Sequence, residues 1–368
     1  MRLPFSTIGL ALAAFWGRPH VAHSGGLRQV QEVDLRKAAH ADNGLPAFPV
    51  FALRFSPDGR KLAVIADIYE TPGGRKSRLL VVDVDHPSER TPQFEAEFGI
   101  VEDENGRLAL NFGWSPSGDV IYAGGKVIHL ESGAMCELPN QSVFINDNVA
   151  ISSRGVPPSG RILSTRVTFY GRNCEQQSAW DVPEVWLVKD VSTDRSLLSI
   201  ARYISTGQVE TLIVDPLARK VLQRRPGNLA WEFAESGKAI CGGGNALQPR
   251  PRAVCRNVDT GDVIREMHTN GTEPIATAAH ATRLVVSDYR RRKPLFDYEY
   301  RTIFKGRVVW DFGTGKEMAS WLPESQTYPY VSSHGTEITE PFRFAMSPNG
   351  QYVAEAGSGK LRIYKIEP

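Results

Sequence analysis

The chain has little net charge, few cysteines and no segment that could cross a membrane as a helix. Its 43 lysines and arginines nearly balance 41 aspartates and glutamates, which leaves a formal charge of +2. So small an excess gives no electrostatic reason to expect a nucleic-acid partner. The apolar run at 5–16 is too short to cross a bilayer, and no other segment is long and apolar enough. The sequence therefore predicts no nucleic-acid binding and no membrane span.

Motifs of covalent, metal and nucleotide chemistry are also missing. The four cysteines form no CxxC pair and no Cys/His spacing typical of a metal site. No GxSxG is present, so the serines beside His334 predict a surface loop and not a hydrolase. The stretch 357–360 lacks the first glycine of a phosphate-binding loop, and Leu361 follows where that loop has Ser or Thr. We therefore expect no metal and no cofactor.

What the chain does contain is a repeated unit, clearest at 51–67 (FALRFSPDGRKLAVIAD). Alternating apolar residues predict a strand, the Ser-Pro-Asp-Gly letters predict a tight turn, and a β-branched run predicts the returning strand. Near copies stand at 114–122 and 346–353. Weaker copies follow Val191, Phe233 and Ala278, and the faintest lies around Asn146, which makes seven units.

A second signature follows the first within the units. VWDFGTGK at 309–316 and NVDTGD at 257–262 predict a strand that ends in a turn and a further strand. Looser versions occur at Asp83, Asp215 and Glu131. Each unit then holds four strands, and the average interval between turns is about 48 residues, slightly above the roughly 40–45 of a WD40 blade.

These residues resemble the WD40-like β-propeller family, in the bacterial Ser-Pro-Asp-Gly variant seen in TolB and YVTN propellers. The eukaryotic Gly-His pair is missing, and only Trp310-Asp311 is a literal WD dipeptide. The resemblance implies an all-β fold: residues 25–368 form a single seven-bladed β-propeller of four-stranded antiparallel blades, closed by the N-terminal strand. The expected blades span approximately 49–99, 108–138, 143–183, 185–224, 228–267, 274–321, and 341–368 together with 29–35.

The strand expected to close the ring is Gln29–Leu35, which has no Ser-Pro-Asp-Gly turn of its own. We expect it to pair beside Leu361–Ile366, because the last unit lacks a fourth strand and an open ring would expose a sheet edge. A short helix over Val30–Ala39 is the alternative that the residue spacing allows.

The N-terminal residues and the cysteines indicate where the protein is located relative to the cell. Residues 1–24 read as a secretory signal whose cleavage leaves Gly25 first, with an apolar tail packed on the domain as the alternative. The expected location is periplasmic or secreted. Cys241 and Cys255 flank a predicted hairpin loop, where they form either a disulfide or two small buried residues. A bridge between Cys136 and Cys174, in adjacent units, is less favoured.

Long connections predict where a ligand binds. Most lie between second and third strands (67–78, 153–161, 242–252 and 288–301) or between blades (101–107 and 322–340), and both kinds emerge on one face of a propeller. Guanidinium groups and aromatic rings there suit an acidic or carbohydrate ligand, with a solvated loop as the alternative. The candidate ligand-binding residues are Arg290, Arg291, Arg292, Lys293, Phe296, Tyr298, Tyr300, Tyr328 and Tyr330.

The function favoured by the sequence is an exported, non-catalytic propeller that acts as a monomeric binding or protein-interaction scaffold. Its partner would be a protein or an acidic or carbohydrate ligand. The alternative is a propeller enzyme, a lactonase-like hydrolase or a quinoprotein, with its site at the mouth of the central channel. Such sites draw residues from several blades, so the lack of a local motif counts only mildly against an enzyme.

Overall fold

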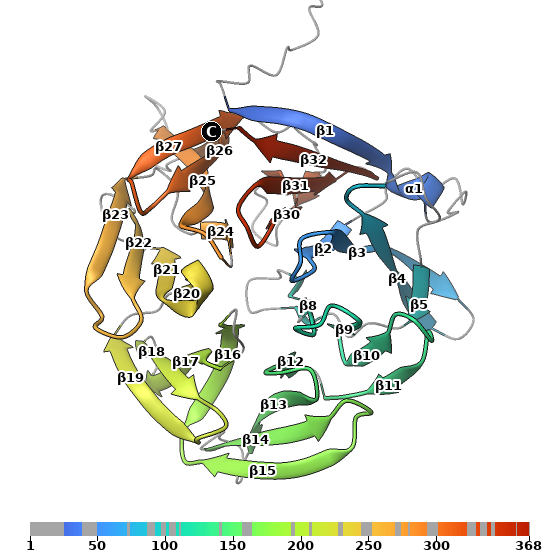
Figure 1. The fold of residues 1–368 in the computed structure, drawn as a ribbon, viewed down its shortest axis with the longest axis vertical. Coiled ribbons are helices and arrows are strands. Elements are labelled where there is room, and N and C mark those ends of the chain that lie inside the picture. The colour runs from blue at the N-terminus through green and yellow to red at the C-terminus, as the bar shows by residue number, and fades with distance from the viewer. Residues whose placement is uncertain are drawn as a thin grey trace, which may run out of the picture.

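Seven four-stranded antiparallel sheets stand around a central axis in the computed structural model (Figure 1). The structure describes residues 26–38, 50–71, 74–86, 93–96, 101–102, 108–109, 112–139, 142–156, 164–192, 196–205, 208–226, 231–243, 252–268, 274–278, 280–292, 301–321, 329–331, 337–339, 343–357 and 359–367. Within these ranges the only helices are α1 (Leu35–Ala38) and a 3-10 turn, η1 (Glu235–Gly237). The predicted seven-bladed, all-β propeller is confirmed.

The blades follow the chain in order, with the first strand of each innermost and the fourth outermost (Figure 1). Blade 1 holds β2 (Val50–Phe55), β3 (Lys61–Thr71), β4 (Gly74–Asp83) and β5 (Gln93–Ala96). Blade 2 holds β8 (Phe112–Trp114), β9 (Val120–Ala123), β10 (Lys126–His129) and β11 (Met135–Glu137). Blade 3 holds β12 (Ser142–Phe144), β13 (Val149–Val156), β14 (Ser164–Gly171) and β15 (Gln176–Val182). Blade 4 holds β16 (Val185–Val191), β17 (Leu198–Ser205), β18 (Gln208–Asp215) and β19 (Lys220–Pro226).

The remaining blades repeat this order up to the seam where the ring closes. Blade 5 holds β20 (Trp231–Ala234), β21 (Ala239–Gly243), β22 (Arg252–Asn257) and β23 (Val263–His268). Blade 6 holds β24 (Pro274–Thr277), β25 (Arg283–Arg292), β26 (Arg301–Asp311) and β27 (Lys316–Trp321). Blade 7 holds β30 (Arg343–Met346), β31 (Tyr352–Gly357), β32 (Lys360–Ile366) and β1 (Leu27–Asp34). Two small sheets pair β6 (Val101–Glu102) with β7 (Leu108–Ala109), and β28 (Pro329–Val331) with β29 (Glu337–Thr339).

The serine of each clear Ser-Pro turn ties the first strand of its blade to the second. In blade 1 the Lys61 N–H donates to Ser56 Oγ at 2.9 Å, and the Ser56 N–H donates to the Lys61 carbonyl at 2.8 Å. Gly59 takes a φ of 74°, which a residue without Cβ adopts at little cost. Because Ser56 is buried, replacing its hydroxyl would leave the Lys61 N–H with one partner fewer.

The core consists of apolar layers between neighbouring blades, so second strands are buried on both faces. In β3, Leu62 and Val64 pack toward blade 7, whereas Ala63 and Ile65 pack toward blade 2. This double burial explains why the strand reads as an unbroken apolar run instead of alternating with polar residues. Each blade therefore depends on both of its neighbours for its hydrophobic contacts.

Ring closure follows the sequence prediction. β1 pairs antiparallel with β32, from Leu27 opposite Ile366 to Asp34 opposite Lys360. The two strands run side by side at the outer edge of blade 7 (Figure 1). The alternative of a helix over Val30–Ala39 is limited to the single turn α1, which starts after the strand has ended.

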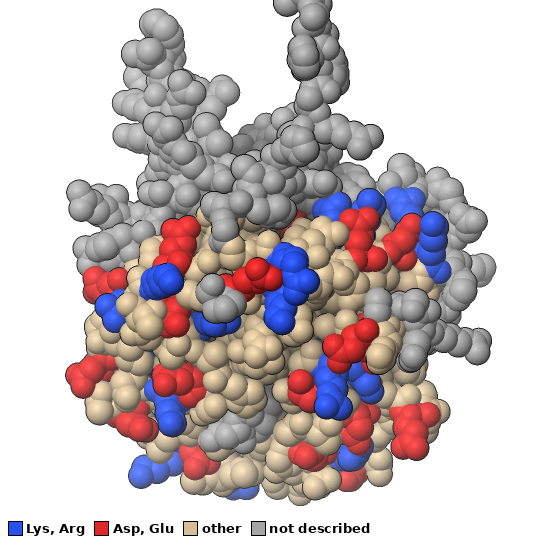
Figure 2. Space-filling view, turned by 45° about the horizontal axis from the view of Figure 1, so that its top comes forward, with Lys and Arg blue, Asp and Glu red and all other residues tan. Residues whose placement is uncertain are grey.

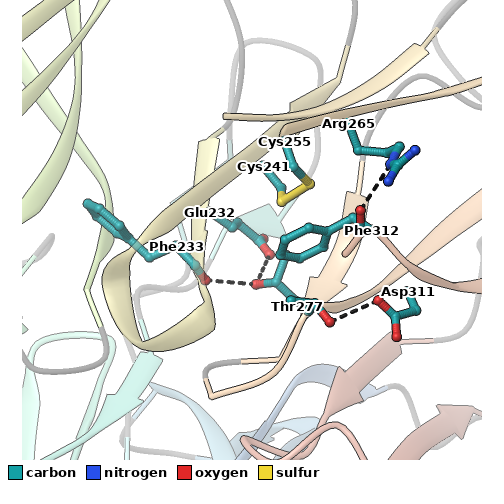
Figure 3. Close-up of a disulfide and its surroundings, with 9 residues drawn as sticks. Glu232, Phe233, Cys241, Cys255, Arg265, Thr277, Asp311 and Phe312 are labelled. Carbon is teal, nitrogen blue, oxygen red and sulfur yellow. Dashed lines mark hydrogen bonds between the residues drawn. A yellow bond between two sulfur atoms is a disulfide. The ribbon is translucent and has the colours of Figure 1, made fainter. Parts of the chain in front are cut away.

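A recurrent contact joins the outermost strand of a blade to the next blade. We call the residue that makes this contact the clasp residue. It lies on the fourth strand of its blade. Its pairing partner on the third strand stands two positions before the turn that joins these strands. In blade 4 it is Gln223, whose Nε2 donates to the Val258 carbonyl and, at 2.7 Å, to the Asp259 carbonyl of blade 5. In blade 5 it is Arg265, which donates to the Phe312 carbonyl at 3.2 Å. The second of these clasps is seen in Figure 3.

The clasp of blade 2 is covalent. Cys136 lies opposite Val127 and forms a disulfide with Cys174 in the corresponding turn of blade 3, with Cα atoms 6.0 Å apart. The sequence analysis disfavoured this pairing, and that judgement was wrong. Membership of adjacent units does not reveal that the outer strand of one blade reaches the turn of the next.

The other two cysteines form a disulfide inside blade 5. Cys241 on β21 lies directly opposite Cys255 on β22, and both side chains are buried (Figure 3). The cross-link clamps the hairpin between these strands, which was one of the two alternatives drawn from the sequence. One disulfide thus joins two neighbouring blades, and the other joins two neighbouring strands of one blade.

Replacing Cys136 and Cys174 by serine together should lower the free energy of unfolding by about 2–4 kcal/mol, because the bridge closes a loop of 38 residues in the unfolded chain. Thermal unfolding followed by tryptophan fluorescence under oxidising conditions measures the effect. Replacing Cys241 and Cys255, whose loop spans 14 residues, is the matched comparison. An unchanged melting temperature of the Cys136/Cys174 variant would show that the clasp adds nothing to stability.

Candidate functional site

The predicted ligand residues are only partly within the described chain. Arg290, Arg291 and Arg292 lie on β25, where they pair with Ile303, Thr302 and Arg301 of β26. Lys293, Phe296, Tyr298, Tyr300 and Tyr328 lie outside the described residues. The structure therefore brings the three arginines together on one strand, and their role in binding stays a prediction.

Tyr330, the remaining candidate, lies on β28 and pairs with Ile338 in a separate small sheet. The sequence predicted a loop over 288–301, but β25 runs through the first five of these residues and β26 begins at the last. Thr302, Ile303 and Phe304 are strong strand formers, and their backbone groups pair with the arginine-bearing strand. The connection at 67–78 is likewise mostly the paired ends of β3 and β4.

One face of the ring receives the ends of these hairpins, and we call it the hairpin face. The strands β3, β13, β17, β21 and β25 all run toward it from the opposite face, where the Ser-Pro turns lie. We call that opposite face the turn face. Charges on the described surface in Figure 2 are interspersed, with lysines and arginines standing beside aspartates and glutamates. This mixed pattern agrees with the small net charge of the chain.

A cluster of four charged side chains lies where the seam between blades 3 and 4 meets the hairpin face. Arg202 on β17 and Glu210 on β18 are directly opposite each other, with Arg202 Nε 2.8 Å from Glu210 Oε2. Arg202 also donates through Nη1 to Glu184, which immediately precedes β16. Arg224 Nη1 of β19 lies 3.6 Å from Glu184 Oε1 and 3.7 Å from Glu210 Oε2. Two guanidinium groups thus bridge two carboxylates.

Two tryptophans border this cluster. Trp186 Nε1 donates to Glu184 Oε2 at 3.0 Å, and the Trp186 ring meets that of Trp180 edge to face, with centroids 5.3 Å apart. Burial by itself would raise the pKa of Glu184. Hydrogen bonds from Trp186 and Arg202, together with the charges of Arg202 and Arg224, outweigh it and hold the pKa below its ordinary value.

This arrangement suits a structural ion cluster better than acid–base chemistry. A general acid or base needs a pKa near the working pH, whereas Glu184 is held in its ionised form. The charges balance within the cluster, so it has no excess charge with which to attract an ionic substrate. The cluster leaves no local signal in the sequence, because Arg202 and Glu210 lie inside strands and meet only through the strand register.

A second group of polar side chains is buried in the seam between blades 6 and 7. Arg307 is 1% exposed, and its guanidinium carbon lies 4.2 Å from the centre of the Phe344 ring. Trp321 Nε1 donates to the buried Glu355 at 3.3 Å. In the outer part of blade 7, Arg362 Nε of β32 donates to Glu32 Oε2 of β1 at 3.0 Å. These side chains, too, join strands and blades to one another.

The described residues contain one serine–histidine contact, on the turn face. Ser236 Oγ lies 3.1 Å from His280 Nδ1, and both residues are exposed. No carboxylate in the described part of the chain is hydrogen-bonded to His280, so the third member of a catalytic triad is missing there. The second serine–histidine pair of the sequence, next to His334, lies outside the described residues.

The described residues contain neither a cluster of metal ligands nor a helix that could span a membrane. No group of three or more His, Cys, Asp or Glu side chains there is placed to hold a metal ion. None of the helices in those ranges has the length and apolarity needed to cross a membrane.

Comparison with known proteins identifies the fold and nothing finer. No family model matches the chain, and no curated protein matches its sequence. Among solved structures, a chain in the "Crystal Structure of Mitotic Checkpoint Complex" is similar, with a TM-score of 0.53, 13% identity and all of both chains covered. The Cps50 (Swd1) β-propeller domain of Myceliophteria thermophila has a TM-score of 0.50 and 12% identity, covering 86% of this chain and 96% of that one.

These neighbours are WD40 β-propellers. The architecture of this chain is that of a seven-bladed β-propeller. At such low identity the likeness concerns fold alone, since propellers carry many unrelated functions. Assignment to the bacterial TolB and YVTN branch stays a prediction from the turn letters.

The variant Glu184→Gln should lower the free energy of unfolding at neutral pH by about 1–3 kcal/mol, because it removes the charge that both arginines bind. The pKa of Glu184 is lower in the folded protein than its ordinary value of 4.5. Its stabilisation is therefore complete above that value and is lost as the pH falls through the lowered folded-state pKa. Urea unfolding at several pH values measures the difference between variant and wild type.

The matched control is Glu317→Gln, an exposed carboxylate on β27 with no ion pair among the described residues. That variant should unfold like the wild type at neutral pH. If the Glu184→Gln variant is as stable as Glu317→Gln, the cluster does not contribute to the stability of the folded protein.

Proposed function

We propose that the protein is an exported, non-catalytic β-propeller that acts as a binding or protein-interaction scaffold. The observation that supports a scaffold is the cross-linking of neighbouring blades on the turn face. Clasp residues join blades on the turn face, and the Glu184 cluster lies on the hairpin face. In the clasps and in the Glu184 cluster, side chains bind other groups of the same chain and are not left to bind a substrate. This arrangement suits a rigid platform that displays extended hairpins.

Export is supported by the N-terminal sequence and the disulfides. A short apolar run with small residues before Gly25 is typical of a cleaved secretory signal. All four cysteines are paired, and structural disulfides persist mainly in oxidising compartments. The proposed location is periplasmic or extracellular.

The proposed ligand surface is the hairpin face around Arg290, Arg291 and Arg292. Arginine matches carboxylates and phosphates through paired hydrogen bonds, so an acidic glycan or an acidic protein segment is the partner class that these residues favour. The competing hypothesis is an enzyme with a site at the channel mouth. Turnover of lactone substrates by the purified protein, or uptake of a quinone cofactor, would favour that hypothesis.

Export predicts a shortened mature protein. When the full chain is produced in a bacterium with an intact secretion pathway, the released form should start at Gly25 and contain no free thiol. Intact mass of the periplasmic fraction, with and without a thiol-alkylating reagent, measures both properties. Recovery of the uncleaved chain with reactive thiols from the cytoplasm would contradict the proposal.

The ligand surface predicts a salt-dependent interaction. Replacing Arg290, Arg291 and Arg292 by alanine together should weaken binding to a heparin column and flatten the dependence of elution on salt. The control is Lys238→Ala, an exposed cation beside η1 on the turn face. Equal retention of wild type and the triple variant would remove these arginines from the ligand surface.

A further inference from the structure

At the seam that closes the ring, the residue at the clasp position makes no clasp, in contrast to Cys136, Gln223 and Arg265. In blade 7 no turn joins β32 to β1, and the equivalent of the clasp residue is Gln31. It follows a β-bulge and lies opposite Ile363, as Gln223 follows a β-bulge and lies opposite Ile213. Its counterpart carbonyls would be those of Val84 and Asp85, which follow β4 in blade 1 as Val258 and Asp259 follow β22 in blade 5. The position and the residue type are both right for a clasp.

The clasp is nevertheless not made. Gln31 is 8% exposed, and its Nε2 has no hydrogen-bond partner among the described residues. A buried N–H donor without an acceptor is costly, so native proteins usually provide one. Beside it lies a groove of about 270 Å³, which we call the seam groove. The residues that line it are Arg28, Val30, Gln31, Val84, Asp85, Tyr352 and Lys365.

The charges around the seam groove are also unusual within this ring. Blades 4 and 6 place a lysine opposite an aspartate at the start of the outer strand, as in Lys220 opposite Asp215. At the corresponding place in blade 7, Arg28 lies opposite Lys365, two cations that repel each other. Arg28 Nε is 2.9 Å from Glu367 Oε1, but that pair is largely exposed and therefore weak.

Two charged groups of the seam groove have no partner in the described structure. Lys365 forms no ion pair there, and neither does Asp85 on the blade 1 wall. The groove therefore offers an ammonium and a buried amide donor on one wall and a carboxylate acceptor on the other. A complementary ligand would carry a carboxylate together with N–H donors.

We propose that the seam groove binds a short peptide segment that carries a carboxylate. The carboxylate lies between Lys365 and Gln31, a peptide N–H donates to Asp85, and an apolar side chain packs on Val30 and Tyr352. A peptide is favoured over a small anion because β1 is an edge strand, paired only with β32, and an extended backbone can add to such an edge. The volume is close to the lower end of ligand pockets, about 300 Å³, which limits the bound segment to a few residues.

The site lies on the outer wall near the turn face and shares no residue with the proposed ligand surface around Arg290. Failure of one would therefore leave the other untouched. The test uses the full chain and the fluorescein-labelled peptide acetyl-Val-Glu-Val-amide, followed by fluorescence anisotropy at low salt. The matched peptide replaces the glutamate by glutamine, and inorganic phosphate serves as a competitor.

We expect saturable binding of the glutamate peptide and at least tenfold weaker binding of the glutamine peptide. Gln31→Leu should weaken binding about tenfold or more, as expected for loss of one hydrogen bond to a charged group. Lys365→Ala should weaken it and flatten its salt dependence. The control Lys316→Ala removes a lysine of blade 6 that occupies the position of Arg28 in the outer strand, outside the seam groove, and it should bind like the wild type.

A measurement without ligand accompanies these titrations. Because Gln31→Leu removes a buried donor that has no acceptor, the variant should melt no lower than the wild type. The proposal is overturned if neither peptide binds saturably, if both peptides bind equally, or if Gln31→Leu and Lys365→Ala leave affinity unchanged. Displacement of the peptide by phosphate at comparable concentration would also overturn it, since the site would then be one for small anions.

Discussion

The pairing of β1 with β32 is the contact on which the rest of the structure depends. Without it, β32 would present an unpaired edge, and blade 7 would lose the strand that carries Gln31 and Glu32. Every apolar layer lies between two blades, so an open ring would also leave the layers beside blade 7 without support. One antiparallel strand pair therefore completes blade 7 and closes the row of seven sheets into a ring.

Given closure, polar contacts at the outer wall fix how neighbouring blades sit against each other. A disulfide at Cys136, an amide at Gln223 and a guanidinium at Arg265 all reach the same part of the following blade. Gln223 and Arg265 donate to backbone carbonyl groups at the turn between third and fourth strands, where carbonyl groups lack ladder partners, whereas Cys136 bonds to a side chain in that turn. Chemically different side chains thus meet one geometric requirement, and the choice among them sets how firmly each seam is held.

Features encoded locally could be predicted from the sequence. The Ser-Pro-Asp-Gly letters specify a turn through Ser56 and Gly59, their recurrence gives the number of blades, and the missing fourth strand predicts closure. Contacts between blades could not be predicted. The disulfide of Cys136 and the pairing of Arg202 with Glu210 depend on strand register and on the side of the sheet that each residue occupies. Neither quantity appears in a local pattern of residue types.

The position of Gln31 illustrates this dependence on register. A β-bulge at Val30 shifts the pairing of β1, so that residues on both sides of the bulge face blade 1. Equivalent bulges precede Gln223 in β19 and Arg265 in β23, whereas the pairing around Cys136 in β11 has none. In blade 7 the bulge is present, but Gln31 Nε2 has no hydrogen-bond partner among the described residues. Because the scaffold is held by the other contacts, one clasp can be left open, and its donor is then available to an acceptor from outside the chain.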